Sequence, residues 1–251
     1  MANWQDPRST AERTGGISAA TVGVPSATRD AGLRSYMLSV YNYMASGVLL
    51  TGIVALLFAP YARQVLFNQA GTGMNPLGWI VTLAPLGFVM AMSFGLNRMS
   101  TATLQLLYWA FATVMGLSMS TIFLAYTGTS IAQTFFAVSA GFAGLSLWGY
   151  TTKKDLSGWG TFLIMGVVGL FVAMLINLFL QSTAMGLVIS ALGVLIFAGL
   201  TAYDTQKIKS MYAYVAGTEM MGKTVIMGAL NLYLDFLNMF LFLLRFMGDR
   251  R

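Results

Sequence analysis

The sequence predicts an all-α integral membrane protein with seven transmembrane helices. Hydrophobic residues make up 57% of the 251 residues and charged residues only 9%, whereas a soluble domain usually carries about 25% charged residues. Seven apolar stretches are each close to the ~20 residues that a helix needs to cross a hydrocarbon core of ~30 Å. The basic residues gather in alternate connections between these stretches, as in a chain that crosses a membrane repeatedly.

The first 34 residues are expected to form a flexible cytoplasmic tail, because they are rich in Ser, Thr, Ala, Gly and Arg and contain no sustained apolar run. They do not have the form of a signal peptide, since no apolar core with a cleavage site follows the basic start. Asp30 and Arg34 are expected to start a helix that continues into the first span. Residues 35–251 form the expected transmembrane domain.

The seven spans are separated by recognisable connections. Pro60 and Pro76 bracket the longest early connection, which contains turn-prone glycines. The connections at 126–128 and 181–183 are so short that the helices they join should be antiparallel neighbours. The expected spans are 35–59, 77–97, 102–125, 129–150, 158–180, 184–206 and 224–247.

The basic residues also predict the orientation of the chain. Ten of the 14 Lys and Arg residues fall on the side of the N-terminal tail and four on the other side. The positive-inside rule therefore places the N-terminus in the cytoplasm and the C-terminus outside. The ten are Arg8, Arg13, Arg29, Arg34, Arg98, Lys153, Lys154, Lys207, Lys209 and Lys223, and the four are Arg63, Arg245, Arg250 and Arg251.

Two residue types are missing, and their absence excludes several kinds of site. The chain has no cysteine, so it has no disulfide, thiol nucleophile or thiolate metal site. It has no histidine either, which removes imidazole ligands and the usual pH switch. Proton chemistry must fall to carboxylates, tyrosines or lysines, and we expect no bound cofactor. The net charge is +6, and the basic residues are distributed unequally between the two sides of the membrane. This distribution indicates orientation rather than nucleic-acid binding.

Asp204 and Asp235 are the acidic residues that lie inside apolar runs, and such a group is costly enough in a membrane to predict a functional site. On the last span, Asn231, Asp235 and Asn238 share one helical face. This polar face should turn toward the bundle interior or a wet cavity. Asp235 is expected near mid-membrane, roughly 18 Å along the helix from Lys223. The alternative is an aspartate that is hydrogen-bonded purely for packing.

Asp204 is expected at the cytoplasmic end of the sixth span, where Lys207 could form an ordinary helix-end ion pair with it. Arg98 ends the second span on the same side. It is either a plain cytoplasm-facing arginine or a partner of Asp204, because the two are expected at similar depth. The expected depths of the two aspartates differ, since Asp204 is expected near the membrane surface and Asp235 near its middle. The two aspartates can meet only if the last helix starts nearer residue 228 or the sixth helix is tilted.

The segments 199–206 (Gly-Leu-Thr-Ala-Tyr-Asp-Thr-Gln) and 231–236 (Asn-Leu-Tyr-Leu-Asp-Phe) resemble the signature of the Bax inhibitor family. The segments 33–37 and 41–44 also look like those of bacterial members. The resemblance covers the chain from about residue 30 to the C-terminus. It implies a bacterial inner-membrane protein in which six helices surround the last.

The resemblance also implies a function, a proton-sensitive calcium leak. The sensor in the family is an aspartate pair on helices six and seven, which matches Asp204 and Asp235. An arginine on helix two is thought to pair with the helix-six aspartate in one state, and Arg98 is the candidate for this latch. Two nearby carboxylates cannot both ionise cheaply, so they titrate as a unit. With Asn231, Asn238 and some carbonyls they would form a weak calcium site that suits transit.

Two other functions remain open at this point. Intramembrane aspartyl proteases also place Tyr-Asp on helix six and an aspartate on helix seven. Here, however, Tyr-Leu precedes Asp235 instead of Gly-x-Gly, and no proline follows Pro85 to form their Pro-Ala-Leu element. The second alternative is a regulator that does not transport and that binds another membrane protein, such as a quality-control protease. We expect no enzymatic activity, and the lipid bilayer, cations and a membrane protein as partners.

Overall fold

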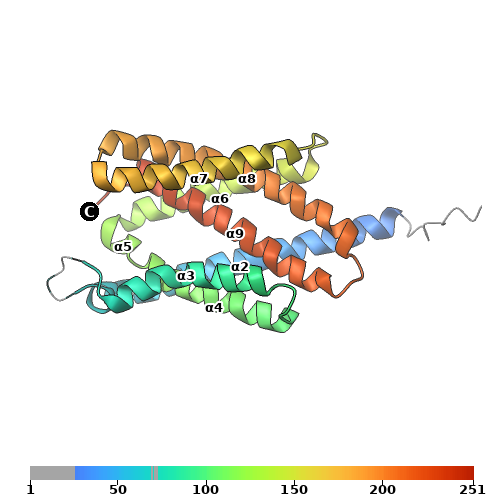
Figure 1. Ribbon diagram of the computed structural model, residues 1–251, viewed down its shortest axis with the longest axis horizontal. Helices are drawn as coiled ribbons and strands as arrows, with labels where there is room; N and C mark the ends of the chain where they lie inside the picture. Colours follow the sequence, from blue (N-terminus) through green and yellow to red (C-terminus); the bar gives the residue numbers. More distant parts are fainter. Residues whose placement is uncertain (1–25, 69, 71–72) are drawn as a thin grey trace, which may run out of the picture.

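Eight helices make up the part of the chain that the computed structural model describes, residues 26–68, 70 and 73–251 (Figure 1). No β-strand occurs among these residues, which confirms the all-α prediction. The helices are α2 (Ser26–Leu66), α3 (Pro76–Gly95), α4 (Thr101–Met119), α5 (Ile122–Ala125), α6 (Gly128–Thr151), α7 (Ser157–Leu180), α8 (Thr183–Val215) and α9 (Met220–Met247).

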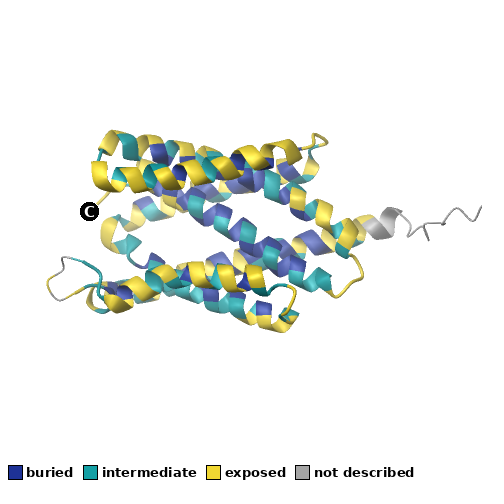
Figure 2. Ribbon diagram, viewed as in Figure 1, coloured by how far each residue is buried: buried dark blue, intermediate teal, exposed yellow. Residues whose placement is uncertain are grey.

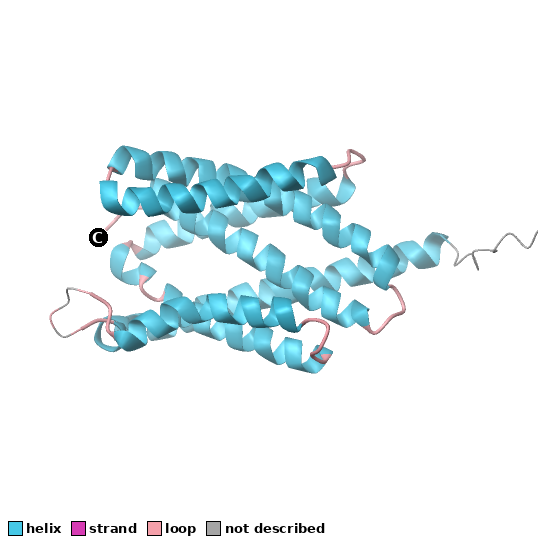
Figure 3. Cartoon of the chain, viewed as in Figure 1, coloured by secondary structure: helices cyan, strands magenta, loops and turns pink. Residues whose placement is uncertain are grey.

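Seven helical segments are long and apolar enough to span a membrane, as predicted, because the single turn of α5 continues the span of α4 to Ala125. The connections lie at the two ends of the bundle (Figure 3). Since the number of spans is odd, α2 begins at one end and the chain reaches its C-terminus at the other (Figure 1). Most of the expected tail, residues 1–25, lies outside the described residues.

Several helices are longer than the apolar runs predict. α2 begins at Ser26, within the expected tail, and continues through Pro60 to Leu66, so the prediction that Pro60 ends the first span is wrong. A transmembrane helix tolerates an internal proline where its neighbours satisfy the freed carbonyl. α8 continues past residue 206 to Val215. Apolar runs mark only the part of a helix that lies within the hydrocarbon core, so they miss turns that extend beyond the membrane.

Polar side chains in the connections cap the N-termini of most of the spans. Each accepts a hydrogen bond from a backbone N–H of the first turn, which satisfies a donor that has no partner within the helix. Pro76 follows one of them at the first helical position, where its missing N–H costs nothing. These N-cap residues are Asn75 for α3, Ser100 for α4, Thr127 for α6 and Ser182 for α8.

The last helix, α9, lies at the centre of the bundle. In its most apolar stretch 72% of the residues are buried, compared with 11% to 33% in the other six spans. Figure 2 shows this as a mostly dark blue helix that runs diagonally through the molecule. Its main packing partners are α2, α4, α6 and α8, while α3 packs on α2 and α4, and α7 packs on α8. The expected arrangement of six helices around the last is therefore present, in two shells.

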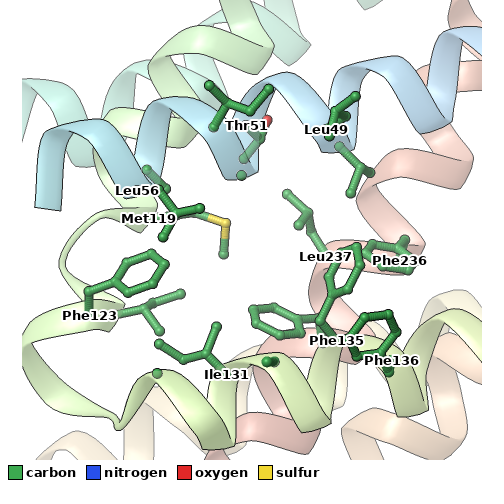
Figure 4. A pocket seen from close by; sticks show the side chains of 18 residues that line it. Leu49, Thr51, Leu56, Met119, Phe123, Ile131, Phe135, Phe136, Phe236 and Leu237 are labelled. Atoms are coloured by element: carbon green, nitrogen blue, oxygen red, sulfur yellow. The ribbon is translucent and has the colours of Figure 1, made fainter.

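The prediction that each short connection joins two neighbouring helices holds for one connection and fails for the other. α7 and α8 pack against each other, as predicted. α4 and α6 do not form a packed pair among the described residues, because a cavity of about 340 Å³ separates them. Side chains of α2, α4, α5, α6 and α9 line it, including Met119, Phe123, Phe135 and Leu237 (Figure 4). The prediction that these two spans are neighbours is wrong, because α5 carries the chain across the gap.

Candidate functional site: a carboxyl pair between α8 and α9

α8 and α9 form an antiparallel hairpin whose connection spans residues 216–219. Asp204 lies eleven residues before the end of α8 at Val215, or roughly 16 Å from it. Asp235 lies fifteen residues after the start of α9 at Met220, or roughly 22 Å from it. The two aspartates are thus at similar depth in the bundle. The expectation that Asp204 ends its helix is wrong, because three further turns follow it.

The side chains of Asp204 and Asp235 lie close enough to interact with each other. Two carboxyl groups in this position can share a hydrogen bond only when one of them carries a proton. Asp235 is 4% exposed, and no N–H or hydroxyl group of the described residues donates to its buried Oδ2 oxygen. Asp204 is half-buried. The structure therefore brings together the two aspartates that the sequence singles out.

Lys207 is the cation whose charge acts on Asp204, from one turn further along the same helix. Its Nζ atom lies 5.9 Å from the centre of the Tyr203 ring. Because Lys207 is exposed, its charge is largely screened by solvent.

Arg98 lies elsewhere in this conformation, exposed in the turn between α3 and α4. The same turn receives a hydrogen bond of 3.3 Å from Lys223 Nζ to the carbonyl oxygen of Leu96, which places it beside the start of α9. Lys223 precedes Asp235 by twelve residues, or roughly 18 Å of helix. Arg98 is not among the groups that act on Asp204. A latch between Arg98 and Asp204 stays a prediction for another conformation.

Asn231 and Asn238 are both half-buried, one turn on either side of Asp235. The Asn238 side chain donates to the carbonyl oxygen of Leu234 on its own helix, at 2.8 Å. Among the described residues, no group of three or more His, Cys, Asp or Glu side chains gathers in a way that could hold a metal ion. Calcium prefers six to eight oxygen ligands, and the two aspartates are the carboxylates that the structure brings together here.

Comparison with known proteins matches residues 33–251 to the family described as inhibitor of apoptosis-promoting Bax1. The chain belongs to the Bax inhibitor family. It is 48% identical to the protein RP147 of Rickettsia prowazekii over 225 residues, which covers 89% of this chain and 93% of the relative. It is 42% identical to the inner membrane protein YbhL of Escherichia coli K12 over 225 residues, 88% of this chain and 94% of YbhL. The resemblance of the two aspartate segments to this family is thereby confirmed.

In this Bax inhibitor family member, the residues beside Asp204 hold α8 in place, a role that the sequence analysis missed. The side-chain amide of Gln206 donates to the carbonyl oxygen of Lys154 and accepts from the backbone N–H of Leu156, both at 2.8 Å. Tyr203 packs against Gly160 of α7. A sequence signal for this role was present in the Tyr-Asp-Thr-Gln segment. Like Asp204, its other polar residues lie at the edge of an apolar run.

Hydroxyl groups tie the helices around the site together. The Tyr41 hydroxyl and Ser146 Oγ are 2.6 Å apart, and Ser146 Oγ lies 2.9 Å from Thr205 Oγ1, so the chain of hydroxyls joins α2, α6 and α8 next to Asp204. On the other side of α9, Thr51 Oγ1 donates to the carbonyl oxygen of Ala112 and lies 2.7 Å from the Tyr233 hydroxyl. One set of hydroxyl contacts thus ties α8 to α2 and α6, and the other ties α9 to α2 and α4.

Proposed function

We propose that this protein is a proton-sensitive cation leak of a bacterial inner membrane, with calcium as the transported ion. The observation that carries the proposal is the close approach of Asp204 to the buried Asp235 at the centre of the bundle. An ionisable pair inside a membrane is expensive to keep and is best explained by a function. The distribution of basic residues favours a cytoplasmic N-terminus.

The pair couples proton binding to helix position. With one proton shared, a hydrogen bond joins α8 to α9. When both carboxyls ionise, they repel each other, and either separation of the helices or a cation between them relieves the repulsion. Because α9 packs against α2, α4, α6 and α8, a change at Asp235 reaches the whole inner shell.

The described conformation suits the closed state of such a leak. On the C-terminal side of the carboxyl pair, the space beside α9 is the apolar cavity of Figure 4. No charged residue lines it, and Thr51 is the polar side chain that reaches it. A cation would have to give up its water there without replacement ligands, which is the basis of a hydrophobic gate.

A non-enzymatic role is part of the proposal. Two facing carboxyls would also suit an aspartyl protease, but the chain lacks that family's elements around and after Asp235. Binding to another membrane protein, such as a quality-control protease, remains an alternative. Calcium flux through the purified protein alone would show that no partner is needed, and a model membrane peptide in the same vesicles should stay uncleaved.

The test is calcium flux in liposomes from acidic to mildly alkaline pH. Asp204→Asn and Asp235→Asn keep the side-chain shape but remove the charge, so each should flatten the pH dependence of the flux. Asp155→Asn is the matched control, because Asp155 is exposed in the connection after α6 and should leave the profile unchanged. If both buried-site variants fold and keep the wild-type pH profile, the aspartates are structural and the mechanism is wrong.

Arg98 is tested in the same assay. If Arg98 pairs with Asp204 in another state, Arg98→Ala should increase the leak. Arg98→Lys should keep part of the effect, although a point charge loses the two parallel hydrogen bonds of a guanidinium. Flux that is unchanged in Arg98→Ala would leave this residue as an ordinary arginine at the membrane surface.

A further inference from the structure

A second cavity, of about 510 Å³, lies between α2 and α6 toward the end of the bundle where α2 begins. α2 and α6 are only loosely packed in the described part of the chain, and the hydrogen bond between the Tyr41 hydroxyl and Ser146 Oγ joins them across this seam. Apolar side chains form most of its lining, among them Leu38 and Met44 of α2 and Phe142 and Leu147 of α6. Leu38 and Leu147 are 50% and 64% exposed, so the cavity opens to the lipid-facing perimeter.

The length of this cavity fits one leaflet of a bilayer. It extends along α2 from Arg34 to Ala45, eleven residues or roughly 16 Å of helix. Half of a ~30 Å hydrocarbon core is nearly the same length. A chain of methylene groups that enters beside Arg34 would therefore end near Met44. Arg34 and Met44 both line the cavity.

Positive charge gathers at the outer end of the cavity. Arg34 lies there on α2, and Tyr150 lies opposite on α6. Lys209 is held beside Tyr150, with its Nζ atom 2.7 Å from the Tyr150 carbonyl oxygen and 4.8 Å from the ring centre. One carboxylate, Asp30, shares a neighbouring hollow with Lys209, so the cations outnumber it.

We propose that this cavity binds an anionic phospholipid, with one acyl chain between α2 and α6 and its phosphate at Arg34. The apolar lining matches the chain, the basic end matches the phosphate, and the separation between them matches a lipid in one leaflet. The cavity of Figure 4 lies further along the same two helices, but no basic residue lines it, so of these two cavities only the one at Arg34 offers a cation to a phosphate.

The inner wall of this lipid site is the chain of hydroxyls described above. Tyr41 and Ser146 both line the cavity, and their hydrogen bond is the one that crosses the seam. Ser146 in turn contacts Thr205, the residue after Asp204. If the carboxyl pair has the function proposed above, a lipid in the seam holds α2 and α6 at a set distance and so acts on the α8 side of that pair.

Lipid binding can be measured without any flux assay. The full-length protein in detergent is mixed with dioleoylphosphatidylglycerol or with zwitterionic dioleoylphosphatidylcholine, and bound lipid is counted by native mass spectrometry. The anionic lipid should bind about fivefold better, as expected for one basic side chain near an anionic headgroup. Arg34→Gln should remove this preference. Arg63→Gln is the matched control, because Arg63 is an exposed arginine at the other end of α2.

A second variant tests the acyl-chain part of the site. Ala143 is exposed and lines the cavity, so Ala143→Phe should fill it and reduce binding of both lipids in a protein that keeps its helicity and size. Unchanged binding in Ala143→Phe, or an unchanged preference in Arg34→Gln, overturns the proposal. Glycerol phosphate that competes as well as the lipid would assign Arg34 to a soluble phosphate instead. A dimer that Ala143→Phe abolishes would assign the cavity to a second copy of the chain.

Discussion

α7 and α9 both cross the bundle, but they are opposites in burial. α7 contains the most apolar stretch of the seven spans, yet only 11% of that stretch is buried. α9 is less apolar, yet 72% of its stretch is buried. Lipid tails are as apolar as leucine, so hydropathy in a membrane shows which helix can face lipid, and polar groups mark the helix that other helices must surround.

The two helices also differ in how they are held. α7 joins the bundle along a narrow stripe of buried residues, Gly160, Leu163 and Leu170, which faces α8. α9 is buried on nearly every side, from Thr224 to Leu244. Side chains on α9 therefore fix the positions of several helices at once, while most side chains on α7 fix none.

The largest expected difference is between leucines of the two helices. Leu232 of α9 is fully buried, so Leu232→Ala should destabilise the fold by about 2–5 kcal/mol. Leu178 of α7 is 67% exposed, and its methyl groups face lipid in either state, so Leu178→Ala should cost less than about 1 kcal/mol. Unfolding by SDS in mixed micelles measures both. Equal losses would mean that burial in this bundle does not determine stability.

A smaller effect is expected from two glycines. A methyl group on Gly149 of α6 would overlap the backbone of Ala202 on α8, two residues before Asp204. Gly149→Ala should therefore cost about 1–3 kcal/mol, as overpacking usually does. Gly169 on α7 has open space around it, so Gly169→Ala should leave the melting temperature unchanged or slightly raised. A stable Gly149→Ala would show that α6 and α8 can separate freely beside the site.

The smallest effect is expected where water reaches the chain, just before α7. Hydrogen bonds from the Ser157 side chain and backbone lower the pKa of Asp155. A lowered pKa contributes stability above the unfolded pKa, and this contribution is lost as the pH falls through the folded pKa. Ser157→Ala should thus raise the Asp155 pKa toward its ordinary value and slightly destabilise the fold near neutral pH, but not in acid. A carboxyl NMR titration measures the shift, and an unchanged pKa would assign the effect to the backbone N–H alone.

Composition and apolar runs were sufficient to predict the seven spans, because crossing a bilayer demands both length and apolarity. They misplaced the end of α8, since Lys207 and Lys209 end the apolar run while the helix continues to Val215. That error put Asp204 too close to the surface and created the apparent mismatch with Asp235. The hydroxyl contacts of Ser146 and Thr205 could not be predicted, because serine and threonine are common in spans and their partners depend on how each helix is rotated.

The central position of α9 has a consequence for biosynthesis. A ribosome makes the chain from its N-terminus, so the six spans of the two shells enter the bilayer before the central helix has been made. Until then, the inward faces of α2 and α8 have no α9 to pack against, and the buried Thr51 of α2 lacks its partner Tyr233. The nascent bundle must stay open, or be held open by the insertion machinery, until the segment that carries Asp235 arrives to close it.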